Sequence, residues 1–81
     1  MSTIKGEVPV FGQGMDEGLL TMILVEAGNP VERGMPLAEV ETAKSTIEIV
    51  AEASGTLTEW LAEKGTILIS GDPLYVIEST D

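Results

Sequence analysis

The sequence contains no cysteine and no histidine among its 81 residues. Without cysteine the chain forms no disulfide and offers no thiolate nucleophile or metal ligand, and without histidine it lacks the commonest general base and the imidazole ligand of zinc. Its longest nearly apolar stretch, LLTMILV, is too short to cross a bilayer, and its first residues lack the apolar segment of a signal peptide. These absences disfavour an autonomous enzyme, and we expect a location in a bacterial cytoplasm or an organelle matrix.

Basic residues are also scarce. Four lysines and arginines stand against fourteen acidic residues, which gives a formal charge of -10. This charge repels nucleic acid and anionic membranes, whereas it suits a partner protein with a basic surface. A chain of this length forms one small domain, residues 1–81, which buries only about 60 to 65% of the surface that its unfolded chain exposes. We expect an acidic interaction module that is monomeric in isolation.

A repeat with a period of 37 residues runs through the chain. Residues 18–41 align with residues 55–78, and ten of the 24 aligned positions are identical. Two copies are too few for a solenoid, which needs about three or more. The repeat therefore predicts a domain with two-fold pseudosymmetry, whose halves span about 5–41 and 45–78. The identical pairs are Gly18/Gly55, Leu20/Leu57, Thr21/Thr58, Leu24/Leu61, Glu26/Glu63, Gly28/Gly65, Gly34/Gly71, Pro36/Pro73, Leu37/Leu74 and Glu41/Glu78.

Each half carries the same series of short apolar segments separated by glycine and proline. This pattern indicates an all-β sandwich or flattened barrel with four strands in each half. Segment 55–65 also has spacing that suits a helix, but its counterpart 18–28 is rich in residues typical of strands, so we expect strand in both. The strands are expected at Lys5–Val10, Leu20–Leu24 (apolar at Leu20, Met22 and Leu24), Val31, Leu37–Glu41, Ser45–Val50, Leu57–Leu61, Leu68 and from Leu74.

The segment ETAKS, residues 41–45, lies between two segments in which apolar and polar residues alternate. If Ala43 and Lys44 form a two-residue turn, the apolar side chains of both strands fall on one face and the polar ones on the other. A slip of one residue would mix them, so the alternation predicts this register. The apolar face then holds Ala38, Val40, Ile47 and Ile49, and the polar face holds Glu39, Glu41, Thr46 and Glu48.

The predicted turn has unusual residues for its length. Two-residue hairpins favour turns with positive φ, which neither alanine nor lysine adopts without cost. Either the turn is of the less favoured type I, or the tip is kept for a reason other than folding. A turn lysine is ordinarily a solvated surface residue or one that discourages strand addition. One lysine with small neighbours, at the junction of two symmetric halves, instead favours a displayed functional residue at Lys44.

Three segments resemble those of one known family. They are GMDEG at 14–18, the segment 28–45 that ends in ETAKS, and EASGTL with GDPL in the second half. Together they are similar to lipoyl and biotinyl carrier domains, and the resemblance extends from about Lys5 to Glu78. It implies a flattened barrel of two four-stranded antiparallel sheets with quasi-two-fold symmetry, in which a modified lysine, Lys44, lies at an exposed hairpin.

The neighbours of Lys44 distinguish the two branches of this family. Biotin carriers usually have methionine on both sides of the modified lysine, whereas Ala43 and Ser45 flank it here. Lipoyl domains most often read Glu-Thr-Asp-Lys-Ala, which this chain matches at Glu41, Thr42 and Lys44. The resemblance thus implies lipoic acid joined covalently to Lys44. Biotin on the same lysine is the alternative, and an unmodified interaction module is an alternative of another class.

A lipoyl domain implies a carrier within the acyltransferase component of a 2-oxo acid (or acetoin) dehydrogenase complex. Its implied partners are a thiamine-diphosphate-dependent 2-oxo acid decarboxylase, the acyltransferase core, a flavin-dependent dihydrolipoamide dehydrogenase and a lipoate-attaching enzyme. The cofactor supplies redox and acyl-transfer chemistry that the side chains lack. We expect Glu39, Glu41 and Glu48 to steer docking onto basic surfaces of these partners or, alternatively, to be solvated residues that favour solubility.

Few other residues suggest chemistry. Asp16 and Glu17 are adjacent carboxylates before a glycine, but no nucleophile, base or metal-binding cluster accompanies them in the sequence. We therefore expect neither a catalytic nor a metal site. Phe11, Trp60 and Tyr75 are expected to pack in the core or against a sheet.

Overall fold

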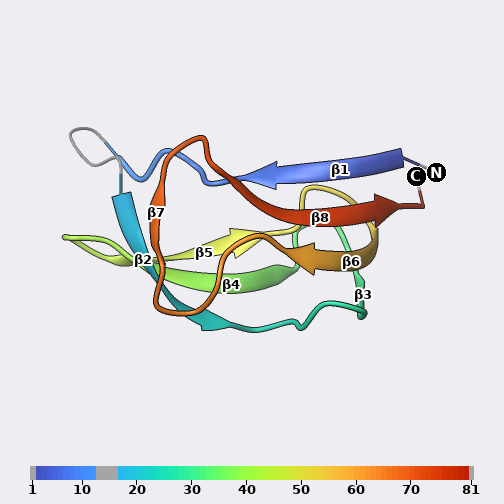
Figure 1. The fold of residues 1–81 in the computed structure, drawn as a ribbon, viewed down its shortest axis with the longest axis horizontal. Helices are drawn as coiled ribbons and strands as arrows, with labels where there is room; N and C mark the ends of the chain where they lie inside the picture. The colour runs from blue at the N-terminus through green and yellow to red at the C-terminus, as the bar shows by residue number, and fades with distance from the viewer. Residues whose placement is uncertain (1, 13–16, 81) are drawn as a thin grey trace.

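The computed structural model describes residues 2–12 and 17–80. Its strands are β1 Ser2–Glu7, β2 Glu17–Ile23, β3 Pro30–Val31, β4 Pro36–Glu41, β5 Thr46–Val50, β6 Gly55–Trp60, β7 Ile67–Ile69 and β8 Pro73–Ser79. They form two antiparallel sheets, ordered β1-β8-β6-β3 and β5-β4-β2-β7, and the predicted fold class is confirmed as a sandwich of two separate sheets (Figure 1). The described residues include no helix of the length and apolarity that a membrane span requires.

The strand order has two-fold pseudosymmetry. Exchanging β1 with β5, β2 with β6, β3 with β7 and β4 with β8 converts one sheet into the other, so each sheet takes two strands from each half. Backbone hydrogen bonds between the halves repeat with the same spacing as the sequence. The Gly28 N–H donates to the Leu57 carbonyl at 2.6 Å, and the Gly65 N–H donates to the Leu20 carbonyl at 2.7 Å. Each half therefore completes the hydrogen bonding of the other.

A β-bulge occurs at the same place in each half. The register of β2 against β4 shifts between Leu20 and Met22, and the register of β6 against β8 shifts at the equivalent residues 57–59. The middle residue of each bulge is a threonine whose hydroxyl donates to a carbonyl of the opposite strand at 3.2 Å, from Thr21 in the first half and Thr58 in the second. The repeated sequence thus encodes a repeated irregularity of the sheets.

Several predicted strand details differ from the structure, two of them with a physical cause. The apolar alternation through Leu20, Met22 and Leu24 is broken by the bulge, which leaves Met22 and Leu24 exposed and Leu20 buried. The first strand ends at Glu7 rather than at Val10, which is 79% exposed. Proline has no N–H to donate to a sheet, so the Pro9 that precedes Val10 disfavours a longer strand.

The core lies between the two sheets, and Tyr75 is the largest of its fully buried side chains. The Tyr75 ring occupies the space that a Cβ at Gly6 would need, and its hydroxyl donates to the Val50 carbonyl of the other sheet at 3.2 Å. Trp60 meets this ring edge-on, with centroids 6.0 Å apart, and donates its indole N–H to the Val25 carbonyl at 2.9 Å. The predicted packing of the aromatic residues is confirmed. The buried cluster comprises Val8, Phe11, Leu20, Val31, Leu37, Ala38, Val40, Ile49, Ala51, Leu57, Leu68, Leu74, Tyr75 and Ile77.

The buried phenol gives a prediction about alkaline stability. Desolvation raises the pKa of Tyr75 above its ordinary value of 10.0, and the negative charge of Glu52 raises it further. The unfolded chain ionises first as pH rises, so the stabilisation is complete below pH 10.0 and is lost as pH rises through the folded-state pKa. Denaturant titrations should show the free energy of unfolding falling more steeply above that pH in the wild type than in Tyr75→Phe. Parallel curves for the two proteins would contradict this account.

The β4–β5 turn and the two chain ends lie at opposite ends of the long axis (Figure 1). The molecule extends 36 Å along this axis and 20 and 18 Å across it. The pseudosymmetry accounts for the arrangement, because it exchanges the turn between β4 and β5 with the break between β8 and β1. The turn therefore lies at the end of the molecule opposite the chain ends (Figure 1).

Candidate functional site

The hairpin of β4 and β5 has the register that the alternating residues predict. Its uninterrupted cross-strand pairs run from Ala38 opposite Ile49 to Glu41 opposite Thr46, and a register shift separates them from the pair of Pro36 and Val50. Ala38 and Ile49 are buried against the core, whereas Glu41 and Thr46 are exposed. The register leaves the two-residue turn at Ala43–Lys44, where the sequence predicts it.

The turn is closed by the side chain of Thr42. The Thr42 backbone N–H and hydroxyl both donate to the Ser45 carbonyl, each at 2.8 Å. The same hydroxyl accepts a hydrogen bond from the Ser45 N–H at 3.1 Å and a longer one from the Lys44 N–H at 3.4 Å. The sequence pattern predicts Thr42 beside the turn but gives no role to its hydroxyl. The available signal was a threonine directly before a short turn without glycine, since threonine hydroxyls bind nearby backbone groups in turns.

The backbone of the turn explains its unusual residues. No non-glycine residue of the described chain has a positive φ. Turns of types I′, II′ and II each need a positive φ at a central residue, so the Ala43–Lys44 turn belongs to none of them. The turn is therefore consistent with type I, which is one of the two explanations that the sequence left open.

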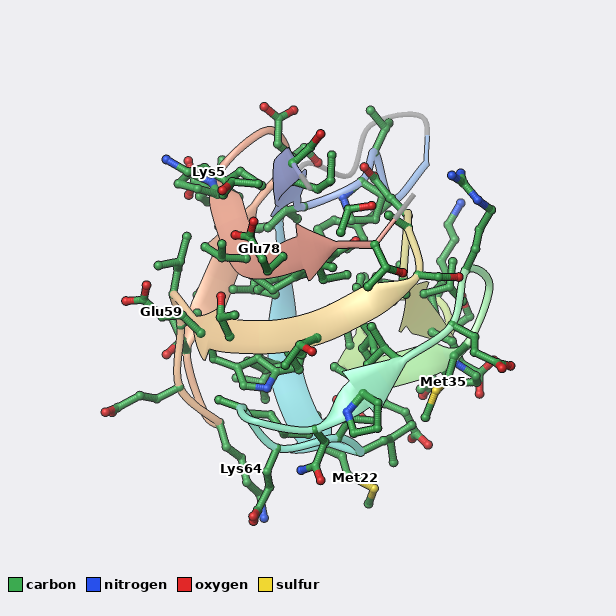
Figure 2. All side chains as sticks on the ribbon, turned by 90° about the vertical axis from the view of Figure 1, so that its right-hand side faces the viewer. Lys5, Met22, Met35, Glu59, Lys64 and Glu78 are labelled. Atoms are coloured by element: carbon green, nitrogen blue, oxygen red, sulfur yellow. The ribbon has the colours of Figure 1, made fainter. Side chains whose placement is uncertain are left out.

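Lys44 is displayed rather than engaged. It is exposed together with its neighbours Ala43 and Ser45. Within residues 2–12 and 17–80 its ammonium group has no hydrogen-bond or ion-pair partner. Lys5 and Lys64 are exposed as well and project from the molecule in Figure 2, which views the end that carries the chain termini. Exposure alone does not distinguish Lys44, but its place at the tip of a hairpin far from the termini does.

Acidic side chains lie on the outer face of the hairpin, behind the tip. Glu39 is half-buried and stands directly opposite the exposed Glu48, while Glu41 pairs with Thr46 and is exposed. Like charges directly opposite each other destabilise a sheet. This pair therefore contributes negative potential near Lys44 at a cost to stability.

The adjacent carboxylates Asp16 and Glu17, considered from the sequence, are only partly described by the structure. Asp16 lies outside the described residues, as do Gly14 and Met15 of the GMDEG segment, and Glu17 is exposed at the start of β2. The described residues include no group of three or more histidine, cysteine, aspartate or glutamate side chains arranged to hold a metal ion. A shallow groove beside β5 brings together carboxylates and apolar side chains; it is lined by Glu7, Pro9, Glu48, Ile49, Val50, Glu52 and Tyr75.

Known protein sequences resemble nearly the whole chain. The family described as "Biotin-requiring enzyme", the biotin/lipoyl family, matches residues 5–77. The dihydrolipoyllysine-residue acetyltransferase component of the pyruvate dehydrogenase complex of Staphylococcus aureus strain Mu50 is 38% identical over 74 residues. The same component of Staphylococcus epidermidis strain ATCC 35984 is 36% identical over 74 residues. Each alignment covers 91% of this chain but only 17% of the relative, so the chain spans a small part of the length of these curated relatives.

Solved structures share the fold. The solution structure of the lipoyl domain of the 2-oxoglutarate dehydrogenase complex from Azotobacter vinelandii aligns with a TM-score of 0.70 and 28% identity, over 98% of this chain and 99% of that one. A single-chain, multi-domain long-chain acyl-CoA carboxylase aligns with a TM-score of 0.80 over 98% of this chain and 7% of that one. The identity to the carboxylase is 19%, so this second likeness concerns the fold alone.

The comparisons and the structure agree with the resemblance drawn from ETAKS and its flanking segments. The family match includes the β4–β5 hairpin and extends into the last strand, and the lipoyl domain of similar fold matches over nearly its full length. The chain belongs to the biotin/lipoyl attachment family and, within it, is homologous to part of the dihydrolipoyllysine acetyltransferases.

Proposed function

We propose that this chain is the lipoyl carrier domain of the acyltransferase component of a 2-oxo acid (or acetoin) dehydrogenase complex, with lipoic acid joined to Lys44. The single observation that carries the proposal is the exposed, unpartnered Lys44 side chain at the tip of a hairpin opposite the chain ends. The segment matches the lipoyl pattern at Glu41, Thr42 and Lys44, and the neighbours Ala43 and Ser45 are not the paired methionines of biotin carriers. The relatives that are dihydrolipoyllysine acetyltransferases add support.

The residues at the tip fit an attached acyl chain. The small side chains of Ala43 and Ser45 leave access to the Lys44 amine, and no neighbouring group in the described residues competes for it. Attachment joins Nζ to the activated carboxyl of lipoate: an amide bond forms, the bond to the activating group breaks, and the ammonium group loses two protons. The formal charge of the domain then falls from -10 to -11, because one lysine becomes neutral.

The tip geometry suits transport between active sites. When bound, lipoic acid supplies a dithiolane that accepts acyl groups and electrons, which no side chain of this chain replaces because it lacks cysteine. The β4–β5 hairpin would hold the attachment point clear of the sandwich, so that only the tip need enter a partner's active site. The partners in this role are the thiamine-diphosphate-dependent decarboxylase, the acyltransferase core and dihydrolipoamide dehydrogenase. Tethering of the domain makes each encounter nearly intramolecular.

Attachment assays test this function directly. The purified domain is incubated with ATP and either lipoate and a lipoate-attaching enzyme or biotin and a biotin-attaching enzyme, and its intact mass is measured. We expect complete conversion to the lipoyl form and little or no biotinyl form. Conversion by the biotin-attaching enzyme alone would make the chain a biotin carrier, and an unchanged mass with both enzymes would make it an unmodified interaction module.

The acidic outer face of the hairpin predicts charge-dependent docking. Reversing the charge in Glu41→Lys should slow reductive acylation of the lipoylated domain by the decarboxylase by about tenfold at low salt, because opposite charges steer association. The two proteins should converge at high salt, where exposed charges are screened. Glu26→Lys is the matched control, since Glu26 is also exposed but lies in the β2–β3 connection toward the end with the termini (Figure 1). Equal rates for wild type and Glu41→Lys at low salt would show that Glu41 is only a solvated residue.

A further inference from the structure

The Thr42 hydroxyl uses all of its hydrogen-bonding capacity within the turn. A hydroxyl group has one donor and two acceptor positions. Here the donor goes to the Ser45 carbonyl at 2.8 Å, and the acceptors receive the Ser45 N–H at 3.1 Å and the Lys44 N–H at 3.4 Å. One side chain therefore fixes three backbone groups in the two residues that follow Ala43.

The environment of Thr42 separates it from the rest of the tip. It is 9% exposed, whereas Ala43, Lys44 and Ser45 are all exposed. A hydrogen bond shielded from water is electrostatically stronger than one in solvent. Thr42 is thus the buried residue at the start of the turn, and the three exposed residues follow it.

Pairing of β4 with β5 does not depend on this hydroxyl. The four cross-strand pairs from Ala38 and Ile49 up to Glu41 and Thr46 set the register, and their apolar side chains pack on the core. The Thr42 backbone N–H also reaches the Ser45 carbonyl without help from the side chain. The hydroxyl acts beyond the last cross-strand pair, Glu41 and Thr46, where it restrains the amides of Lys44 and Ser45.

We infer that Thr42 is a positioning residue for the modification of Lys44, because its hydroxyl holds the backbone that presents the amine. The inference rests on the proposed function and deepens it by identifying what the attaching enzyme meets: a preformed turn in which the backbone of Lys44 is held in place. Without the hydroxyl, the amides of Lys44 and Ser45 would lose these hydrogen bonds, and the turn would sample several conformations. Attachment would then slow, because misplacement of a reacting group by about 1 Å costs up to about a hundredfold in rate.

Two isolated changes at Thr42 distinguish the hydroxyl from the shape of the side chain. Thr42→Val keeps the branched shape and removes the hydroxyl, whereas Thr42→Ser keeps the hydroxyl and removes the methyl group. We expect kcat/KM for lipoate attachment to fall by roughly ten- to a hundredfold in Thr42→Val and to stay within about threefold of wild type in Thr42→Ser. Amide hydrogen exchange in the unmodified proteins should be faster at Lys44 and Ser45 in Thr42→Val only.

Thr58→Val serves as the matched control. The Thr58 hydroxyl donates to the Val76 carbonyl at 3.2 Å in the other sheet, so this variant loses a threonine hydrogen bond without touching the turn. Thr58 is exposed and its hydroxyl donates one hydrogen bond, whereas Thr42 is buried and its hydroxyl takes part in three, so the thermal midpoint should fall less than in Thr42→Val. Attachment kinetics and exchange at Lys44 should stay as in wild type. If loss of stability alone slowed attachment, each variant would be slowed in proportion to the fall of its thermal midpoint.

Three outcomes would overturn the inference. They are wild-type attachment rates in Thr42→Val, unchanged exchange at Lys44 and Ser45, and an equal slowing in Thr42→Ser and Thr42→Val. If Thr42→Val does not fold, Thr42→Ala takes its place in the hydrogen-exchange and attachment measurements and is compared with Thr42→Ser. Thr42→Ala should then show the slower attachment and faster exchange expected of Thr42→Val. Failure of the wild type itself to accept lipoate would instead overturn the proposed function, and the exchange measurement would still report on the turn.

Discussion

Lys44→Arg is expected to accept no lipoate at all. Arginine keeps the positive charge and a long side chain, but its guanidinium stays protonated in proteins and offers no amine for acylation. The side chain of Lys44 is exposed and has no partner in the described residues, so its replacement should change the free energy of unfolding by no more than about 0.5 kcal/mol. Intact mass after incubation with lipoate, ATP and the attaching enzyme measures the effect.

Lys5→Arg and Lys64→Arg are the matched controls for this experiment. Both lysines are exposed and project from the molecule in Figure 2, and neither belongs to the β4–β5 hairpin. Each control should be converted as fully as the wild type. Residual conversion of Lys44→Arg, or its loss in either control, would place the attachment point elsewhere.

Gly6→Ala is expected to destabilise the domain by about 2 to 4 kcal/mol, as overpacking and displacement of a large core side chain commonly do. A Cβ at position 6 of β1 would overlap the ring of Tyr75, which is fully buried. The ring has little freedom to move, because its hydroxyl is bonded to the Val50 carbonyl and its face meets Trp60. Small domains have a total stability of about 5 to 15 kcal/mol, so chemical denaturation should show the loss clearly.

A double-mutant cycle identifies Tyr75 as the cause. The cost of Gly6→Ala should persist in a Tyr75→Phe background, which keeps the ring, and should fall below about 1 kcal/mol in a Tyr75→Leu background, which removes it. Lys5→Ala, at the exposed neighbouring position of β1, should have little effect. An equal cost of Gly6→Ala in all three backgrounds would show that the Tyr75 ring is not the cause of the loss.

The features that the sequence predicts well depend on regular patterns. The register of the β4–β5 hairpin follows from period-two alternation, because only one alignment buries Ala38 and Ile49 together. The two-fold pseudosymmetry follows from the repeat, whereas the repeat does not predict that each sheet takes two strands from each half. Lys44 was predicted as the tip for the same reason, since it falls in the gap between two well-registered strands.

The features that were missed depend on irregular local contacts. The bulge around Thr21 changes which face of the sheet the residues after Leu20 point to. The pattern of apolar residues in the sequence does not predict this bulge. The side chain that closes the tip was also missed, because alternation treats Thr42 only as one more polar residue. Contacts between distant residues, such as the Tyr75 ring over Gly6, require the three-dimensional fold before they become visible.

Tandem mass spectrometry of the lipoylated wild-type domain tests the central claim most directly. After incubation with lipoate, ATP and the attaching enzyme, the domain is digested and every lysine-containing peptide is sequenced. The account predicts one lipoyl group per chain, on the peptide that contains Lys44, with Lys5 and Lys64 unmodified. A lipoyl group on either of those lysines, or a domain that stays unmodified, would contradict it.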